Sequence, residues 1–430
     1  MRSPGDVAPT PDVGQRLGSE DIVIDVGQLL EKVETAAPID AVEAVAAALG
    51  EMLEATTVTL LIADFTGRAV VRLTSAELVD GARGRGIEQA ETLPLAGTVY
   101  DQVLRTQEAD VRADGDGAVM VVPVTDRGDA IGVIELALPR YPSAKEVADV
   151  RSAAHALAYV VIAARRHTDV FEWGQRSAPF ALAAEIQRRL LPASYTCEAG
   201  QFTLAGWLEP ASSVGGDTFD YNLDRDHLQL SITDAVGHQV DAALLATLLV
   251  GSLRNGRRGG MDLAEQAAYA NDALDQHAPS GQFVTGQLMR VDLRAGTAAI
   301  VNAGHVLPLR LRNGRVEEVQ LRIEPPFGVV PGKTFEVQPF SLEPGDRIVF
   351  LTDGMQERNA VRLDVARAMA DTADLHPREV VHALGAAILE ETGGDLRDDA
   401  TMICLDWYGG PPRGRTTEQG ADPGRASPPA

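Results

Sequence analysis

Aspartates that follow or precede apolar runs are the side chains of this sequence best suited to chemistry. They lie in four segments of the second half of the chain: GGDTFD (215–220), TDAVGH (233–238), TDG (352–354) and RDDAT (397–401). The run LQLSIT leads directly into Asp234, and RIVFLT leads directly into Asp353. Asp398 and Asp399 stand just before the run ATMICL. A strand fixes the residues at its ends, so we expect these acids to meet at one edge of a sheet core.

Carboxylates gathered in this way favour metal binding. Close together they repel one another and raise each other's pKa values, a conflict that a divalent cation removes. Sites with oxygen ligands alone select Mg²⁺ or Mn²⁺ over zinc or copper. Two such ions can activate a water molecule and hold a phosphoryl oxygen. Hydrolysis of a phosphate monoester, which is very slow without a catalyst, is a reaction that suits such a site.

Each acidic segment also has a plainer explanation. Asp-Gly is a common hairpin turn, GGD can be a turn, and Asp-Asp before a strand is often a solvated entry. The metal hypothesis depends on the occurrence of all four segments in one domain, in a fixed order.

The elements that must position these acids form a domain predicted over 196–408. Helices are predicted over 241–253, 261–276 and 376–391, and strands over LQLSITD, FVTGQLMRVDL, TAAIVNAG, PLRLRN, RIVFLTD and ATMICLDW. This mixture of hairpins and helices predicts a sheet core covered by helices.

A separate α+β domain with an antiparallel sheet is predicted over 26–168. Helical patterns interrupted at Pro38 precede two strand runs around 64–67, and the strands AVMVVPV and AIGVIELAL precede a closing helix from Ser143. The order resembles the GAF sensory domain, which implies a small-molecule ligand or dimerisation. Residues 26–168 contain no cysteine, so a thioether-linked bilin is not expected.

The predicted domains are joined and flanked by simpler segments. Helical pattern continues with few breaks from Pro142 to Leu190, and residues 169–195 are predicted to be a helical linker or switch. A lever or homodimer stalk and a plain closing helix with a linker are equally compatible with this pattern. The Pro- and Gly-containing ends, 1–25 and 409–430, are predicted to be disordered.

Composition excludes several classes of function. The formal net charge of −24 disfavours nucleic acid and anionic lipid as partners. No window approaches about 18 uninterrupted apolar residues, so we expect no membrane span. We also expect no secretory signal at the N-terminus, because it lacks an apolar core region. The two cysteines, Cys197 and Cys404, lack zinc-site spacing and fit a reducing, cytoplasmic compartment.

The second domain resembles the SpoIIE-type branch of the PPM family, the metal-dependent phosphatases related to protein phosphatase 2C. The resemblance covers about 184–407 and is carried by AEIQRRLLP, VGGDTFD, SITDAVGH, FVTGQLMRVDL, VNAGHVLPL, LEPGDRIVFLTDG and DDATMICL. It implies an αββα sandwich with two or more Mn²⁺ or Mg²⁺ ions at one end of two packed sheets.

The resemblance also implies roles for individual residues. Asp234 would bridge two ions, and Asp353 and Asp398 would complete the first metal site. The backbone carbonyl of Ala235 and the Asp217 carboxylate would serve the second ion. The remaining residues of the metal site would support these ligands: Asp399, Asp220, Gly354 and His305.

One position departs from the family pattern D-x-x-G-H-G. The last glycine is replaced by Gln239, which puts the turnover rate in doubt because the acids themselves remain. His238 in this motif is expected to be a helix-start histidine rather than a general acid. The cluster of Arg254, Arg257 and Arg258 is interpreted as a solvated loop that could also meet an acidic partner.

The activity implied by the resemblance is hydrolysis of phosphoserine or phosphothreonine by a metal-activated water, under control of the GAF-like domain. The implied substrate is a phosphorylated anti-sigma factor antagonist. Two alternatives stay open: a weakly active or inactive sensor or scaffold, and a nucleotide cyclase. The cyclase is suggested by the similarity of GGDTF to the diguanylate cyclase signature GGDEF, although Thr218 stands where that signature has an acid.

Overall fold

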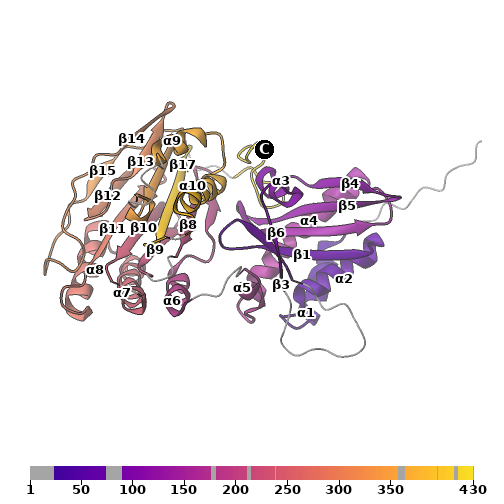
Figure 1. Cartoon of the computed structure of the whole chain (residues 1–430), viewed down its shortest axis with the longest axis horizontal. Coiled ribbons are helices and arrows are strands. Elements are labelled where there is room, and N and C mark those ends of the chain that lie inside the picture. Colours follow the sequence, from indigo (N-terminus) through magenta and orange to yellow (C-terminus); the bar gives the residue numbers. More distant parts are fainter. Residues whose placement is uncertain are drawn as a thin grey trace, which may run out of the picture.

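Two domains lie side by side in the computed structural model, and the end of the chain lies near their junction (Figure 1). The structure describes residues 24–73, 90–175, 181–210, 215–237, 239–356, 364–394, 396–410 and 415–429.

The N-terminal domain is built on an antiparallel sheet of six strands in the order β3-β2-β1-β6-β5-β4. The strands are β1 (Thr57–Ala63), β2 (Ala69–Leu73), β3 (Ala90–Pro94), β4 (Asp110–Asp114), β5 (Gly117–Asp126) and β6 (Asp129–Leu138). Their side chains alternate between two cores. Leu60 and Ile62 pack with the helices α1 (Val26–Thr35), α2 (Ala41–Leu53) and α4 (Ala144–Ala164), whereas Leu61 packs with α3 (Val99–Thr106). The predicted α+β class is confirmed, and the GAF resemblance stays a prediction.

Helix α4 closes this domain. It begins at a capping box in which Ser143 and Glu146 bond each other's backbone N–H groups. By length and composition it is the one described helix that could cross a membrane, and 44% of its apolar window is buried inside the protein. Val150, Leu157 and Val161 pack in the domain core, which accounts for its apolar composition.

The helical pattern between the domains forms three separate helices, which agrees with the alternative of a closing helix followed by a linker. Helix α4 ends at Ala164, α5 covers Val170–Gly174, and α6 covers Leu182–Leu190. The turn after Ala164 redirects the chain, so the described residues contain no continuous stalk.

The C-terminal domain is an αββα sandwich, as the resemblance implied. One sheet has the order β15-β12-β11-β10-β9 and the other β14-β13-β16-β17-β8-β7. The strands are β7 (Thr196–Glu198), β8 (Phe202–Glu209), β9 (Asp217–Leu223), β10 (His227–Ala235), β11 (Val284–Asp292), β12 (Thr297–Ala303), β13 (Leu309–Arg312), β14 (Arg315–Glu318), β15 (Gln338–Phe340), β16 (Asp346–Leu351) and β17 (Ala400–Trp407).

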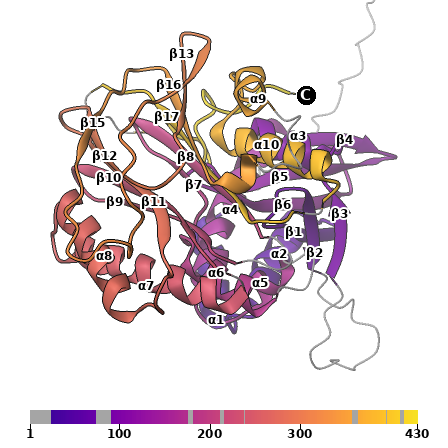
Figure 2. The same cartoon turned by 60° about the vertical axis from the view of Figure 1, so that its left-hand side comes forward.

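Helices cover the outer face of each sheet in the sandwich (Figure 2). The first sheet packs against α7 (Gln239–Arg258) and α8 (Leu263–His277), and the second against α9 (Val365–Asp371) and α10 (Pro377–Thr392). Between the sheets lies a third core, which includes Phe219, Ile232, Phe350 and Ile403. The helix α6 packs beside α7.

The C-terminal segment differs from the predicted disordered tail. Residues 415–429 lie against both domains, where Arg415 and the Asp422 backbone N–H donate hydrogen bonds to the buried Glu198 carboxylate. The Gly128 N–H donates to the Gly420 carbonyl, which ties the segment to the N-terminal domain. A buried carboxylate needs such donors, and the Gly- and Pro-rich composition gave no sign of them.

Candidate metal centre

Strand alternation places Asp217 and Asp234 between the two sheets. Asp217 has the same parity as Phe219 on β9, and Asp234 has the same parity as Ile232 on β10. The two aspartates are direct partners in the β9–β10 register. Like charges in directly opposite positions destabilise a sheet, so this pair calls for a compensating cation.

The second sheet brings its own acids to the same end of the sandwich. Thr352, the residue after β16, donates from Oγ1 to the Asp217 carboxylate at 2.7 Å and thereby joins the two sheets. Asp353 follows as the first residue of a short 3₁₀ helix, η1 (Asp353–Gln356), and is exposed. A Cβ atom on Gly354 would overlap the carbonyl oxygen of Asp399, so only glycine lets these two segments meet.

The Asp399 carboxylate points inward and is held by donors from the first sheet and from α6. Its Oδ2 atom accepts hydrogen bonds from the Gly216 N–H at 3.0 Å and from the Gln187 side-chain amide at 2.6 Å. The same amide nitrogen donates to the Asp217 carbonyl at 2.7 Å. Gln187 therefore links α6 to two of the aspartates.

The carboxylates perturb one another strongly. Burial, and then the charges of Asp353, Asp398 and Asp399, raise the pKa of Asp234 to about 7. Burial, and then the charges of Asp234 and Asp399, raise the pKa of Asp217 well above its usual range. These shifts mark a group of acids that is costly to ionise without a positive charge nearby.

The donor chemistry fits a hard cation such as Mg²⁺ or Mn²⁺, because every candidate ligand is an oxygen atom. In the part of the chain that the structure describes, no group of three or more His, Cys, Asp or Glu side chains already stands in a geometry that could hold a metal ion. Asp217 and Asp399 are buried, Asp234 and Asp398 are partly exposed, and Asp353 is exposed. The cluster is thus open to solvent on one side.

His305 fastens the two sheets behind these acids. Its Nδ1 atom lies 2.8 Å from the Thr285 hydroxyl, and its Nε2 atom lies 3.0 Å from the Leu351 carbonyl. A carbonyl can only accept, so Nε2 carries the proton and Nδ1 accepts from the hydroxyl. Burial lowers the pKa of His305 to about 4, which keeps the imidazole neutral. The histidine positions the strand that leads to Asp353.

Comparison with known proteins shows which family this part of the chain resembles. Residues 224–408 match the family described as Stage II sporulation protein E, SpoIIE. The match covers most of the C-terminal domain, which we therefore call the SpoIIE-type domain. The matched residues include Asp234, Asp353, Asp398 and Asp399 and begin after Asp217.

Individual relatives resemble about half of the chain. Protein IcfG of Synechocystis sp. (strain ATCC 27184 / PCC 6803 / Kazusa) is 24% identical over 255 residues, which cover 51% of this chain and 40% of that protein. Phosphoserine phosphatase RsbU of Bacillus subtilis (strain 168) is 22% identical over 237 residues, which cover 52% of this chain and 68% of RsbU. The chain therefore spans less than half the length of IcfG.

One similar solved structure contains the RsbU and RsbW domains of Rv1364c from Mycobacterium tuberculosis. It is 25% identical in sequence, with a TM-score of 0.44, and the match covers 50% of this chain and 62% of that one.

Asp220 lies apart from the other acids of the SpoIIE-type domain. It is three residues from Asp217 on β9, so its side chain points to the opposite face, toward α7. There it pairs with Arg254 at 2.8 Å and with Arg257 at 3.1 Å. Arg254 also donates to the carbonyl of Leu190, the last residue of α6. The expected solvated arginine loop is therefore the last turn of a helix that packs on β9 and α6.

The motif that departs from the family pattern leads into α7. Gln239 has a backbone φ of 54°, in the left-handed region that favours glycine. This backbone conformation explains why the family pattern has a glycine at the position. A non-glycine residue in this conformation lowers stability by about 1 kcal/mol. His238 lies outside the described residues.

Helix α6 buries its small residues and Gln187 rather than its largest apolar residues. Ile186 and Leu190 are only half-buried, whereas Ala183, Ala184 and Gln187 are buried. A Cβ atom on Gly215 would be too close to Ala183, so this glycine lets the helix approach the start of β9. Gln187 was not predicted from the sequence. The only feature that could have indicated its role is that a polar residue shares a helix face with the small residues Ala183 and Ala184.

Proposed function

We propose that the SpoIIE-type domain is a metal-dependent serine/threonine protein phosphatase. The proposal is carried by one observation: aspartates from both sheets gather at one end of the sandwich and raise each other's pKa values. The family match and the similarity to phosphoserine phosphatase RsbU support the same reaction.

The proposed ligands are those that the family resemblance implied. Asp234 would bridge two ions, Asp353 and Asp398 would complete the first site, and Asp217 with the Ala235 carbonyl would serve the second. Mn²⁺ or Mg²⁺ bound here supplies an activated water and balances the charge that develops on the phosphoryl group. Thr352 and Gln187 hold Asp217 and Asp399 in place through the hydrogen bonds described above.

The proposed substrate is a phosphorylated protein, an anti-sigma factor antagonist of a partner-switching pathway. Asp353 is exposed at the rim of the cluster, so a phosphorylated segment of another protein can reach it. The similarity to phosphoserine phosphatase RsbU supports the phosphorylated substrate, and the antagonist is what the family resemblance implies.

Control by the N-terminal domain is the second part of the proposal. Arg189 of α6 pairs with Glu172 of α5 at 2.9 Å, and the Arg188 guanidinium lies over the ring of Phe65 in the N-terminal domain. Because Gln187 of the same helix reaches Asp399, a shift of the N-terminal domain is transmitted to the acids.

The decisive experiment measures Mn²⁺-dependent hydrolysis of a phosphoserine peptide by the full chain. We expect Asp234→Asn and Asp353→Asn to lower kcat/KM by more than about 100-fold, because even groups that only orient ligands are worth 10–100-fold. Asp224→Asn, in the loop before β10, is the matched control and should leave the rate unchanged. Full activity in the Asp234 variant would refute the proposal.

A scaffold without activity is the second candidate, favoured by the strained Gln239. A calorimetric titration with Mn²⁺ separates the two functions. A chain that binds Mn²⁺ and hydrolyses the peptide is an enzyme, whereas a folded chain that binds no Mn²⁺ at millimolar concentration is a scaffold.

A further inference from the structure

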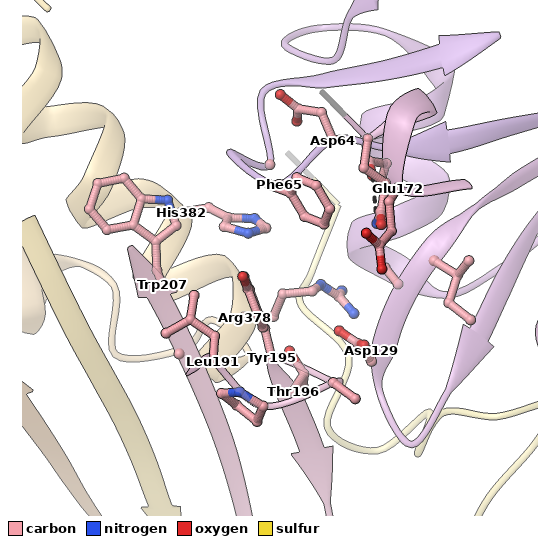
Figure 3. A pocket seen from close by; sticks show the side chains of 18 of the residues that line it. Asp64, Phe65, Asp129, Glu172, Leu191, Tyr195, Thr196, Trp207, Arg378 and His382 are labelled. Carbon is pink, nitrogen blue, oxygen red and sulfur yellow. Dashed lines mark hydrogen bonds between the residues drawn. The ribbon is translucent and has the colours of Figure 1, made fainter. Parts of the chain in front are cut away.

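A cavity of about 480 Å³ lies between the two domains, away from the aspartate cluster. Figure 3 shows Phe65 and Glu172 of the N-terminal domain and linker on one side, with Tyr195, Trp207 and His382 of the phosphatase domain opposite them. Its size is that of a pocket for a small organic molecule.

Polar atoms without partners point to what the cavity holds. The Nε and Nη2 atoms of Arg165, the Nε1 atom of Trp207 and the Oε1 atom of Gln175 are buried and have no hydrogen-bond partner among the described residues. All three residues line this cavity, and Trp207 is only 2% exposed. Buried polar groups are normally satisfied, so three donors and one acceptor around one cavity indicate a missing ligand.

The orphaned edge of Arg165 defines the chemistry. The N–H groups on Nε and Nη2 of a guanidinium are parallel and match the two oxygens of a carboxylate or phosphate. Other arginines of the cavity are already engaged: Arg189 pairs with Glu172, and Arg378 donates to two backbone carbonyls. Among the arginines that line the cavity, Arg165 is the one with buried guanidinium nitrogens, Nε and Nη2, that have no hydrogen-bond partner in the described part of the chain.

The charge and polarity of the cavity walls further limit the chemical class of the ligand. Asp129 and Glu172 lie close enough to interact with Arg165, so a dianion would be repelled more than a monoanion. Leu191, Ile131 and the rings of Phe65 and Trp207 form apolar walls. A single carboxylate on an apolar or aromatic body satisfies both conditions.

We propose that this interdomain cavity binds a small organic monocarboxylate, whose carboxylate pairs with Arg165 and whose body packs against Phe65 and Trp207. The ligand would also accept a hydrogen bond from the Trp207 Nε1 atom and donate one to the Gln175 Oε1 atom. These two bonds would satisfy the remaining buried atoms without a partner.

The position of the cavity gives such a ligand access to α6. Arg188, Arg189 and Leu191, at the end of that helix, line the cavity, and Gln187 of the same helix contacts Asp399. The bound carboxylate therefore stabilises one docking of α6 between the domains. Any effect on hydrolysis rests on the proposed phosphatase function, whereas the binding itself does not.

The test is ligand-observed NMR on the full chain with benzoate, phenylacetate and indole-3-acetate at millimolar concentration. The corresponding neutral amides serve as controls for the charge. We expect at least one acid to bind and its amide to bind about tenfold more weakly or not at all, as for the loss of a charge-assisted hydrogen bond.

Variants locate the site. Arg165→Lys keeps the charge but loses the parallel N–H pair and should weaken binding about tenfold. Trp207→Phe keeps a ring and loses the donor, which keeps the test informative if the Arg165 variant does not fold. Arg112→Gln, at an exposed arginine of the same domain, should bind as the wild type does.

Two outcomes overturn the proposal. One is that none of the three acids binds, so that only water fills the cavity. The other is binding that neither the Arg165 nor the Trp207 variant weakens. Because the assay detects binding without turnover, loss of phosphatase activity in the Asp234 variant leaves it unaffected, and the two proposals fail separately.

Discussion

Replacement of Gln187 by leucine tests whether α6 holds the metal centre in shape. The Gln187 side chain is fully buried and donates to the Asp399 carboxylate at 2.6 Å and to the Asp217 carbonyl at 2.7 Å. Leucine has a similar size and no donor. The bond to the charged carboxylate is worth about 1.5–3 kcal/mol and the bond to the carbonyl about 0.5–1.5 kcal/mol.

Only part of this lost free energy affects metal binding. The bond to the Asp217 carbonyl fixes backbone, so its loss lowers stability. The bond to Asp399 orients a carboxylate within the cluster, so its loss weakens Mn²⁺ binding by roughly 10–100-fold, since 1.4 kcal/mol is tenfold. Calorimetric titration of the full chain with Mn²⁺ measures this directly, and the Mn²⁺ dependence of peptide hydrolysis should shift in parallel.

Gln201→Leu is the matched control. Gln201 is buried and also donates two hydrogen bonds of 2.7 Å, to the carbonyls of Leu293 and Gly410. It lies beside Phe202, at the end of β8 far from Ala400. This variant should lose stability and keep its Mn²⁺ affinity. An Mn²⁺ affinity of Gln187→Leu within about twofold of the wild type, or an equal shift in both variants, would refute the coupling.

Three further predictions concern stability. The depressed pKa of His305, about 4 against an ordinary 6.5, contributes stability above pH 6.5 that is lost as the pH falls toward 4. This amounts to about 3 kcal/mol, and His305→Gln should remove that pH dependence in urea unfolding; equal profiles would contradict it. Asp220→Asn leaves the two arginines of α7 without their carboxylate. This variant should lower the unfolding free energy by roughly 2 kcal/mol and leave the Mn²⁺ affinity unchanged. Asp217→Asn, by contrast, should weaken Mn²⁺ binding and stabilise the metal-free chain. Removal of 411–430 leaves Glu198 with fewer donors and should lower the melting temperature; an unchanged temperature would show that the segment contributes nothing.

The positions of the acids could be predicted because apolar runs and turn chemistry are local. LQLSIT and RIVFLT are strands in the structure, and Asp234 and Asp353 stand where those strands end. The sandwich followed from the family resemblance, since no local pattern determines how two sheets pack.

Long-range partners could not be predicted. The donors to Asp399 come from Gln187 and Gly216, which are far from it in the sequence, and nothing nearby marks them. The orientation of Asp220 could have been predicted from strand alternation alone. Asp220 is three residues from Asp217, and side chains an odd number of residues apart in a strand lie on opposite faces of the sheet. The arginines near residue 257 were assigned to a loop because glycines flank them, although basic residues are also favoured in the last turn of a helix.

The alternation along β10 has a consequence for how the domain tolerates changes of length. Inserting or deleting one residue between Leu228 and Asp234 would turn the aspartate toward α7 and bring its neighbour between the sheets. A change of two residues restores the side on which the aspartate lies. The loop around Asp224, between β9 and β10, lies outside the strand, so a change of its length leaves the alternation within β10 unchanged. Length variation among homologous domains should therefore collect in that loop and be absent, or even-numbered, within the strand.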